Sequence, residues 1–337
     1  MMLPAEVTSL PSDHLLKPST NPPPFFVVLL GPTGVGKSAM AVELAHRVEG
    51  EIVSLDSMQV YRRLNIGTAK PTEAERRGIP HHLIDVVDPD RPFTAVDYGR
   101  LARPALWEIQ GRGRPPLVVG GSGLYLRALR GEIFPGPGEV QGLRSRLREE
   151  VRTQGSEAVH ARLKSLDPSA AQRIHPHDAF RIIRALEILE ITGRPVSELW
   201  ELHRQQVPPF SGLLLGLRRE GQELYRRINE RVDRMVEDGL IQEVRSLLED
   251  YPADIKPFRS HNYRHIVAYL RGRVGLEEAV RRTKRDTRHY AKRQMTWFRR
   301  EEGIQWVPIS DAVSGQILKG LADQIQQARD AAWKSLG

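Results

Sequence analysis

The residues with the most specific chemical pattern are 31–38, which read Gly-Pro-Thr-Gly-Val-Gly-Lys-Ser. They match the phosphate-binding pattern G-x-x-x-x-G-K-[ST] and lie between an apolar run at 25–30 and a helix-forming run at 39–45. In that context, backbone N–H groups and a helix N-terminus converge on an anion. The lysine adds a point charge to the outer phosphate. The sequence therefore predicts a site for a di- or triphosphate.

The residues expected to bind the diphosphate are Gly31, Thr33, Gly34, Val35, Gly36, Lys37 and Ser38. Ser38 is also the expected metal ligand, because the serine or threonine hydroxyl at this place in the loop can ligate Mg²⁺. Mg²⁺ is the cofactor that this pattern predicts.

Polar side chains follow two further strand-like segments. Asp56 comes directly after one apolar run, and Ser122 follows another that ends in two glycines. Strand-like and helix-like segments alternate from 25 to about 130, which predicts an α/β fold with a parallel sheet flanked by helices, as in P-loop NTPases. Ligands of such sheets lie at the carboxyl ends of the strands, so Lys37, Asp56 and Ser122 are expected to share one rim.

The end of the later strand bears on the kind of reaction. A P-loop that hydrolyses ATP usually has a second acidic group there, which helps to hold Mg²⁺. Here the strand-like segment 117–119 ends in Gly-Gly-Ser-Gly, and the nearest candidate acid is Asp56. This favours a phosphate held for departure as pyrophosphate over one held for phosphoryl transfer. An ATP-dependent small-molecule kinase stays as the alternative.

Composition limits the class of protein. The 337 residues are 40% hydrophobic and include no cysteine, which excludes disulfides, thiolate zinc sites and cysteine nucleophiles. No apolar run approaches the roughly 20 residues of a membrane span, and the first 24 residues lack the apolar core of a signal peptide. We expect a cytoplasmic protein with no membrane partner. Without a coiled-coil seam, a monomer is the default expectation.

The pattern also predicts the domain organisation. Residues 1–24 contain proline and serine and are expected to form a flexible extension. Residues 25–130 and 206–337 are expected to form the catalytic core with C-terminal helices. Between them, 131–205 begins with a Pro/Gly-rich connector and continues with helical spacing, which predicts a helical insertion.

The net charge of +8 is concentrated in one segment. Residues 281–300 hold nine Lys/Arg and one Asp, so the rest of the chain is close to neutral. A basic helix with aromatic residues indicates a polyanionic partner, whose phosphates the cations neutralise. Tyr290, Trp297 and Phe298 lie on one helical face, so they either pack in the core or stack on a base.

Several segments resemble, in the same order, those of bacterial tRNA dimethylallyltransferases, also called tRNA isopentenyltransferases. The matching segments are 31–38, 54–61, 66–71, 81–85, 119–125, 181–187 and 290–298. The resemblance covers roughly residues 25 to 310.

The resemblance implies a transfer reaction. A dimethylallyl group moves from dimethylallyl diphosphate to N6 of the adenosine immediately 3′ of the anticodon, in tRNAs that read codons beginning with U. Lys37, the loop amides and Mg²⁺ at Ser38 would stabilise the leaving diphosphate. Asp56 would accept the N6 proton. Ser122 would orient the base or a phosphate, or cap the helix that follows it.

The resemblance also implies the tRNA contacts. The segment after Asp56 resembles the one that reads the flipped base, and the helical insertion resembles the arm that grips the anticodon stem-loop. With the basic helix added, the residues expected to bind tRNA are Asp56, Ser57, Met58, Gln59, Ser122, Arg144, Gln172, Arg173, Ile174, His175, Pro176, Arg285, Arg288, Lys292 and Arg293.

Two positions depart from the family pattern. Gly221 stands where the family usually has an arginine, so Arg218 or Arg219 is expected to supply that charge to the diphosphate. His261-Asn262-Tyr263 replaces the usual Ile-Gly-Tyr, which puts the local turn in doubt. A tRNA-binding protein that has lost its catalytic activity is therefore a further alternative.

Overall fold

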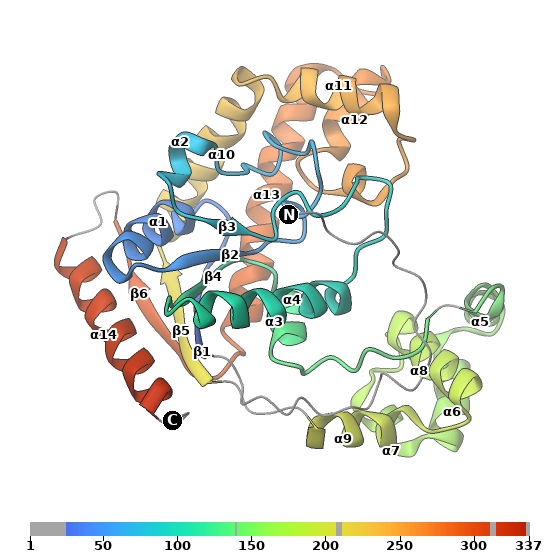
Figure 1. Ribbon diagram of the computed structural model, residues 1–337. Helices are drawn as coiled ribbons and strands as arrows, with labels where there is room; N and C mark the ends of the chain where they lie inside the picture. The colour runs from blue at the N-terminus through green and yellow to red at the C-terminus, as the bar shows by residue number, and fades with distance from the viewer. Residues whose placement is uncertain (1–24, 139, 207–210, 311–314, 335–337) are drawn as a thin grey trace. The chain divides into compact units, whose positions relative to one another are not determined.

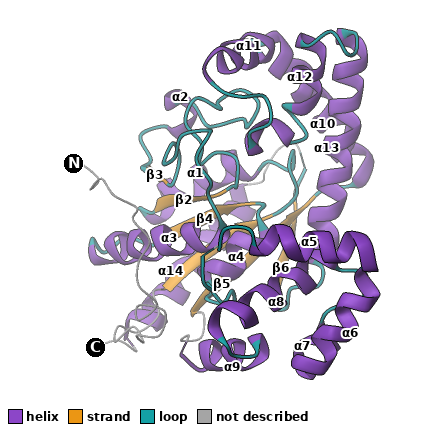
Figure 2. Cartoon of the chain, turned by 90° about the vertical axis from the view of Figure 1, so that its right-hand side faces the viewer, coloured by secondary structure: helices purple, strands orange, loops and turns teal. Residues whose placement is uncertain are grey.

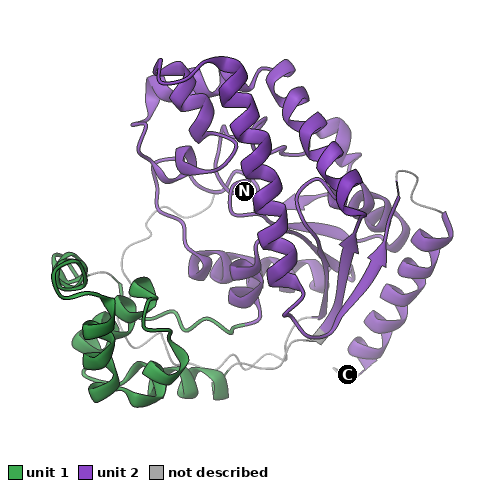
Figure 3. Cartoon of the chain, turned by 180° about the vertical axis from the view of Figure 1, so that it is seen from behind, with its two compact units in different colours: residues 1–22, 131–208 green, residues 23–130, 209–337 purple. Residues whose placement is uncertain are grey.

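A computed structural model describes residues 25–138, 140–206, 211–310 and 315–334. The extension expected at 1–24 lies outside the described residues. The chain forms two compact units, one built on residues 131–208 and the other on residues 23–130 and 209–337 (Figure 3). In the part of the chain that the structure describes, no helix is both long and apolar enough to span a membrane.

The larger unit is built on a six-stranded parallel sheet with the strand order β3-β2-β4-β1-β5-β6 (Figure 1). The strands are β1 (Phe25–Leu30), β2 (Glu51–Leu55), β3 (His81–His82), β4 (Pro116–Gly120), β5 (Ser211–Arg218) and β6 (Ile304–Pro308). The parallel α/β fold predicted from the sequence is confirmed.

Helices cover both faces of this sheet (Figure 2). Those of the larger unit are α1 (Lys37–Val48), α2 (Glu73–Arg76), α3 (Ala95–Gly111), α4 (Gly123–Leu129), α10 (Gly221–Glu237), α11 (Leu240–Asp250), α12 (Arg264–Leu270), α13 (Leu276–Phe298) and α14 (Gly315–Lys334), with a 3₁₀ turn, η2, at Lys256–Arg259. Because α1 and α14 pack on one face and α3 packs on the sheet as well, every residue of β1 is buried.

One segment differs from its sequence pattern. The apolar run at 82–87 continues the spacing of a strand, but β3 ends at His82. Leu83 and Asp85 have φ angles of 60° and 58°, which interrupt the extended backbone. The Asp85 carboxylate accepts a hydrogen bond from Lys70 Nζ at 2.5 Å, so an ion pair fixes a turn there.

The smaller unit is helical. It contains α5 (Leu143–Gln154), α6 (Ser156–Leu166), α7 (Pro168–Arg173), α8 (Ala179–Thr192) and α9 (Val196–Gln206), which enclose their own apolar core. Within that unit, the fully buried Glu187 accepts hydrogen bonds from Arg144, at 3.1 and 2.9 Å, and from Arg184, at 2.7 Å. Although burial alone would raise the pKa of Glu187, the two guanidinium groups hold that pKa below its usual value.

Replacing this carboxylate tests how much the ion pair stabilises the smaller unit. Glu187→Gln removes the charge that neutralises Arg144 and Arg184, so the free energy of unfolding is expected to fall by about 2–3 kcal/mol. Because the folded pKa is depressed, the loss is full at neutral pH and shrinks as pH falls below about 4. Urea unfolding followed by circular dichroism at pH 7 and at acid pH measures both. The exposed Glu198→Gln serves as the control, with little change expected; equal effects of the two variants would contradict the role of burial.

Candidate active site

The glycine loop between β1 and α1 has the geometry of an anion cradle. Gly34 and Gly36 have φ angles of 82° and 111°, which favour glycine, and α1 begins directly after them. The ammonium group of Lys37 donates hydrogen bonds to the carbonyl oxygens of Gly31, at 2.8 Å, and Pro32, at 2.9 Å. The loop thus holds its own lysine at the N-terminus of the helix, where a phosphate would bind.

Lys37 lies in an unfavourable environment for a positive charge. Burial and the neighbouring guanidinium of Arg231 lower its pKa from 10.5 to about 7, and the carboxylate of Asp56 offsets part of that shift. At neutral pH the ammonium group is therefore only partly protonated. An anionic ligand that arrives in the loop favours the charged form, so the site binds an anion and a proton together.

Asp56 is fixed at the end of β2 by its own turn. Its Oδ1 accepts hydrogen bonds from the backbone N–H groups of Met58, at 2.8 Å, and Gln59, at 3.3 Å. The carboxylate lies close enough to Lys37 to affect the pKa of that lysine. β1 and β2 both pair with β4, so the two groups share the edge of the sheet that the sequence predicted.

Ser122 joins this rim from the end of β4. Its hydroxyl accepts a hydrogen bond from the backbone N–H of Ser57 at 3.1 Å. Ser122 occupies the N-cap position of α4, but its side chain makes no cap hydrogen bond. Of the two roles expected from the sequence, helix capping is therefore wrong. The hydroxyl instead ties the loop after β4 to the loop that carries Asp56.

A glutamine on α13 connects the glycine loop to the end of β4. The side-chain oxygen of Gln294 accepts from the backbone N–H of Thr33 at 2.9 Å, and its amide nitrogen donates to Gly121 O at 3.0 Å. A Cβ atom at Gly121 would lie 2.2 Å from that nitrogen, so a larger residue there would displace the Gln294 amide. Sequence reasoning missed Gln294 as a site residue. Its signal was a polar residue on the apolar face of a basic helix.

The Gln59 amide does not point freely toward a base. Its oxygen accepts from the Ser54 hydroxyl at 3.1 Å, and its nitrogen donates to the carbonyl oxygens of Thr68, at 3.3 Å, and Ala69, at 3.2 Å. Gln59 therefore anchors the loop at 65–70. Its expected pairing with an adenine edge would require these hydrogen bonds to break, so we assign it a positioning role.

The same loop explains the departure at 261–263. The Asn262 amide donates to Gly67 O at 2.7 Å and accepts from the Thr287 hydroxyl at 3.1 Å, and its φ angle is not positive. The turn therefore does not require the glycine that the family usually has. His261 stacks on Tyr290 with ring centroids 4.6 Å apart, and burial and Arg231 lower the pKa of His261 to about 4.

The second departure is Gly221, where the family usually has an arginine. Gly221 is the exposed first residue of α10. The guanidinium of Arg219 donates to Val35 O at 3.3 Å and Ser310 O at 2.9 Å and pairs with Glu223. Arg219 therefore binds the backbone of the glycine loop at Val35. The side chain of Arg218 is exposed.

Arg231, also on α10, is a cation near the site that the sequence analysis did not identify. It is close enough to Lys37, Asp56 and His261 to shift or be shifted in pKa with each of them. Burial lowers the pKa of Arg231 itself, and the charge of Asp56 offsets part of that shift. The signal lay in the spacing, since Arg231 follows the buried Ile228 by three residues and shares its face of the helix.

The basic helix α13 has two distinct faces. Its buried residues include Ala291, Gln294 and Phe298, so core packing is correct for Phe298. Trp297 packs over Gly123, where a Cβ atom would lie 2.5 Å from the indole ring. The exposed face holds a cavity of about 460 Å³ lined by His289, Lys292, Arg293, Thr296, Trp297 and Arg300. This lining contains no carboxylate, which suits a phosphate backbone.

The other two cations expected to bind tRNA from this helix, Arg285 and Arg288, already have partners within the protein. Arg285 is exposed but donates to the neighbouring Asp286 at 3.1 Å. Arg288 is half-buried and donates to Asn229 Oδ1 at 2.6 Å. Lys292 and Arg293 are therefore the expected cations with the most accessible charge.

The expected tRNA contacts of the smaller unit are placed as follows. Gln172, Arg173 and His175 are exposed and Pro176 is half-buried, whereas Ile174 is a core residue, only 4% exposed. Arg144 is engaged with Glu187. These contacts stay predictions, and Ile174 can contribute only through its backbone or through the core.

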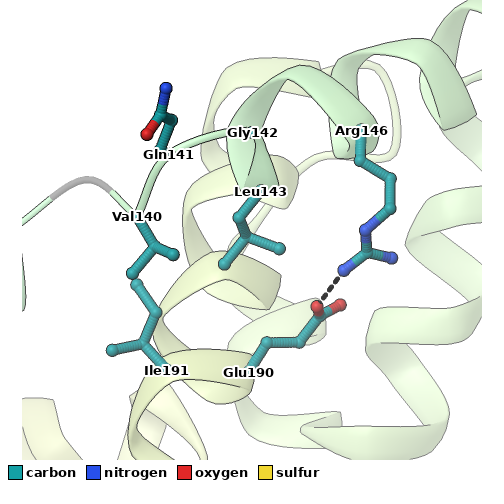
Figure 4. Close-up of a pocket in the computed structure, with 7 residues that line it drawn as sticks. All are labelled: Val140, Gln141, Gly142, Leu143, Arg146, Glu190 and Ile191. Carbon is teal, nitrogen blue, oxygen red and sulfur yellow. Dashed lines mark hydrogen bonds and ion pairs between the residues drawn. The ribbon is translucent and has the colours of Figure 1, made fainter.

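A separate cavity of about 560 Å³ lies beside the N-terminus of α5 (Figure 4). Its two charged residues, Arg146 and Glu190, pair with each other rather than with an open site. None of the residues expected from the sequence lines it.

The protein supplies few metal ligands. Within the described ranges, no group of three or more His, Cys, Asp or Glu residues could hold a metal ion. The candidate oxygen donors are the exposed hydroxyl of Ser38 and the carboxylate of Asp56. Such a sparse set suits a divalent cation that keeps several waters and is held largely by the phosphates of the ligand.

The lowered pKa of Lys37 makes binding of a diphosphate depend on pH. Below pH 7 the ammonium group is already charged, so affinity is insensitive to its titration. Above pH 7, binding must take up a proton, and affinity for a diphosphate is expected to fall by up to about tenfold per pH unit. Isothermal titration calorimetry at pH 8, in two buffers with different heats of ionisation, measures the uptake. Lys37→Met should bind more weakly without proton uptake; uptake that persists in this variant would assign it to another group.

Comparison with known proteins agrees with this geometry. The family profile described as IPP transferase matches residues 59–301, and that described as isopentenyl transferase matches residues 25–87. The tRNA dimethylallyltransferase of Geobacter metallireducens is 51% identical over 282 residues, which are 83% of this chain and 91% of that protein. The tRNA dimethylallyltransferase of Geobacillus thermodenitrificans is 44% identical over 286 residues, which are 85% of this chain and 90% of that protein.

Solved structures show the same likeness. A tRNA isopentenylpyrophosphate transferase from Bacillus halodurans is 40% identical with a TM-score of 0.70, over 92% of this chain and 98% of that chain. A eukaryotic dimethylallyltransferase, solved as crystallographic snapshots while acting on tRNA, is 29% identical with a TM-score of 0.74, over 86% of this chain and 74% of that chain. The glycine loop, the rim that carries Asp56 and the basic helix thus occur in a chain that belongs to the IPP transferase family.

Proposed function

We propose that this prenyl transferase moves a dimethylallyl group from dimethylallyl diphosphate to N6 of the adenosine 3′-adjacent to the anticodon, in tRNAs that read codons beginning with U. Diphosphate is the second product. One observation carries the proposal: the Asp56 carboxylate is close enough to the phosphate-binding Lys37 to affect its pKa, and the two follow strands that both pair with β4. The site thus combines a carboxylate that can act as a base with a lysine that can bind an anion.

The leaving group is assigned to the glycine loop. An adenine amine is a weak nucleophile, so the reaction needs strong stabilisation of the departing diphosphate. Lys37 and the loop amides hold the phosphates, and Arg231 supplies the charge that Gly221 lacks, because it lies close to both Lys37 and Asp56. Mg²⁺ is the proposed metal, held by the Ser38 hydroxyl and the diphosphate, and it would supply Lewis-acid stabilisation of the leaving oxygen.

Asp56 is the proposed general base. As N6 attacks the allylic carbon, the carbon–oxygen bond to the diphosphate breaks and the new carbon–nitrogen bond leaves N6 with an excess proton. Asp56 accepts that proton. The turn that fixes its Oδ1 leaves one carboxylate oxygen outside those backbone hydrogen bonds. Ser57, Met58 and Ser122 surround this position and are proposed to hold the flipped adenine.

The tRNA is proposed to bind along α13 and the smaller unit. Lys292 and Arg293 line a carboxylate-free cavity, and Arg173 and His175 are exposed on the helical insertion. The insertion is proposed to grip the anticodon stem-loop. Since tRNA is the substrate, we place the enzyme in the cytoplasm. We propose that it acts as a monomer, because the sequence has no coiled-coil seam.

Neither alternative is favoured. A small-molecule kinase lacks support because β4 ends without the second carboxylate, and the relatives described above are named for transfer to tRNA. The two departures from the family pattern suggested a loss of catalytic activity. However, Asn262 donates to Gly67 O in the loop at 65–70, and Arg231 supplies a positive charge near Lys37. These two observations support an active enzyme over one that has lost its activity.

The general base can be tested by Asp56→Asn, which preserves the acceptor of the turn but removes the base. Transfer of labelled dimethylallyl diphosphate to an unmodified tRNA is expected to slow by at least about 100-fold, while tRNA affinity stays near that of the unchanged protein. A filter-binding assay run beside the transfer assay separates the two. Asp88→Asn, at the exposed ion pair with Arg62, is the control. Normal transfer by Asp56→Asn would remove Asp56 from the mechanism.

The exposed face of α13 can be tested through the salt dependence of tRNA binding. Reversing Lys292 and Arg293 to Glu should weaken binding and lower the slope of log K against log [salt] by about 1 for each phosphate that the helix no longer neutralises. Lys319→Glu with Lys334→Glu reverses two exposed charges on α14 and is the matched control. If both double variants have the slope of the unchanged protein, α13 does not face RNA.

A further inference from the structure

One carboxylate binds the backbone of the loop at 65–70. Glu243, in the first turn of α11, accepts hydrogen bonds from the backbone N–H groups of Asn65, at 2.9 Å, Ile66, at 2.7 Å, and Gly67, at 3.1 Å. Successive N–H groups that converge in this way form the kind of backbone nest that binds an anion. Here the anion is a side chain of the protein itself, from a helix far along the chain.

A fourth hydrogen bond fixes the carboxylate. The phenol of Tyr263 donates to Glu243 Oε1 at 2.6 Å. Burial and the nearby carboxylate raise the pKa of Tyr263, so the phenol stays protonated and remains a donor. The Tyr263 ring also lies against Gly67, where a Cβ atom would be 2.5 Å from it. Both oxygens of Glu243 are thus engaged, Oε1 by Tyr263 and Gly67 and Oε2 by Asn65 and Ile66.

The loop needs such support because part of its backbone is strained. Ala69 has a φ angle of 45°, in the left-handed region that is unfavourable for a residue other than glycine. Such a conformation persists only where the surrounding structure fixes it. The buried Lys70 adds hydrogen bonds to Tyr61 O, at 3.0 Å, and to Asn65 Oδ1, at 2.8 Å. Glu243 and Lys70 therefore hold the loop at its two ends.

The loop in turn supports the segment that follows β2. The side chain of Gln59 donates to Thr68 O and Ala69 O, and its backbone N–H donates to Asp56 Oδ1. A shift of the loop would therefore move Gln59 and loosen the turn that holds Asp56. The hydrogen bonds of the glycine loop described above involve none of the residues 65–70. Such a shift should leave the diphosphate site in place.

We propose that Glu243 is a positioning residue for prenyl transfer. Its carboxylate fixes the loop at 65–70, and the loop, through Gln59, fixes the turn that carries Asp56. Glu243 acts through the loop rather than on a substrate. The effect on transfer rests on the proposed function, whereas the contacts of Glu243 with the loop do not.

Glu243→Gln tests the effect on transfer. It keeps the size of the side chain but replaces one carboxylate oxygen with an amide nitrogen, which cannot accept from the N–H groups of the loop. Single-turnover transfer of labelled dimethylallyl diphosphate to an unmodified tRNA is expected to slow by about 10- to 100-fold, as for small misplacements of reacting groups. Affinity for inorganic diphosphate with Mg²⁺, measured by calorimetry, is expected to equal that of the unchanged protein.

Glu51→Gln is the matched control. Glu51 is a buried carboxylate that pairs with Arg112 and Arg114, but it is the first residue of β2, whereas Asp56 follows the last. The transfer rate of Glu51→Gln is expected to equal that of the unchanged protein, at a temperature where circular dichroism shows both variants folded. Equal losses of rate in the two variants, no loss in Glu243→Gln, or a loss of its diphosphate affinity would overturn the proposal.

Hydrogen exchange tests the contacts of Glu243 without the reaction. In Glu243→Gln, amide exchange followed by mass spectrometry should be faster in peptides that cover 57–60 and 65–70, and unchanged in those that cover 31–38. Unchanged exchange at 65–70 would overturn the proposal. If the unchanged protein transfers no label, the proposed function fails, and the exchange experiment still decides whether Glu243 fixes the loop.

A milder variant serves if Glu243→Gln does not fold. Tyr263→Phe keeps the ring against Gly67 and removes one of the four hydrogen bonds to the carboxylate. It is expected to change the transfer rate and the exchange at 65–70 in the same direction, by less. If neither quantity changes in Tyr263→Phe, the proposal is overturned.

Discussion

The amide of Gln294 makes two hydrogen bonds on which the arrangement of the site depends. One is to the glycine loop at Thr33 and the other is to the end of β4 at Gly121. Because the amide is buried, both of its ends must be satisfied within the protein. The basic helix α13 is thereby fixed against the phosphate loop, so the surface proposed for RNA and the site proposed for the diphosphate share one rigid support.

Electrostatics then define what this support can bind. Lys37 and Arg231 are two cations close to each other, with Asp56 as the nearby carboxylate. Burial disfavours both positive charges, which a bound diphosphate would relieve. One cluster of charges therefore combines cations that can bind the leaving group with the carboxylate proposed as the base.

Prediction from the sequence succeeded where the chemistry is local. The glycine loop, the parallel sheet and the shared rim of Lys37, Asp56 and Ser122 follow from motifs and strand ends. It failed where a side chain has more than one possible partner. Gln59 was expected to face a base, but its side chain binds the backbone at Thr68 and Ala69.

The sequence by itself determined the phosphate loop, the class of fold and the family, because these depend on residue types at fixed spacing along the chain. Only the tertiary structure decided that Gln294 joins two loops and that Arg231 lies near Lys37. Those partners lie on segments far apart in sequence. Their contacts follow from how α10, α13 and the sheet pack, which no local pattern encodes.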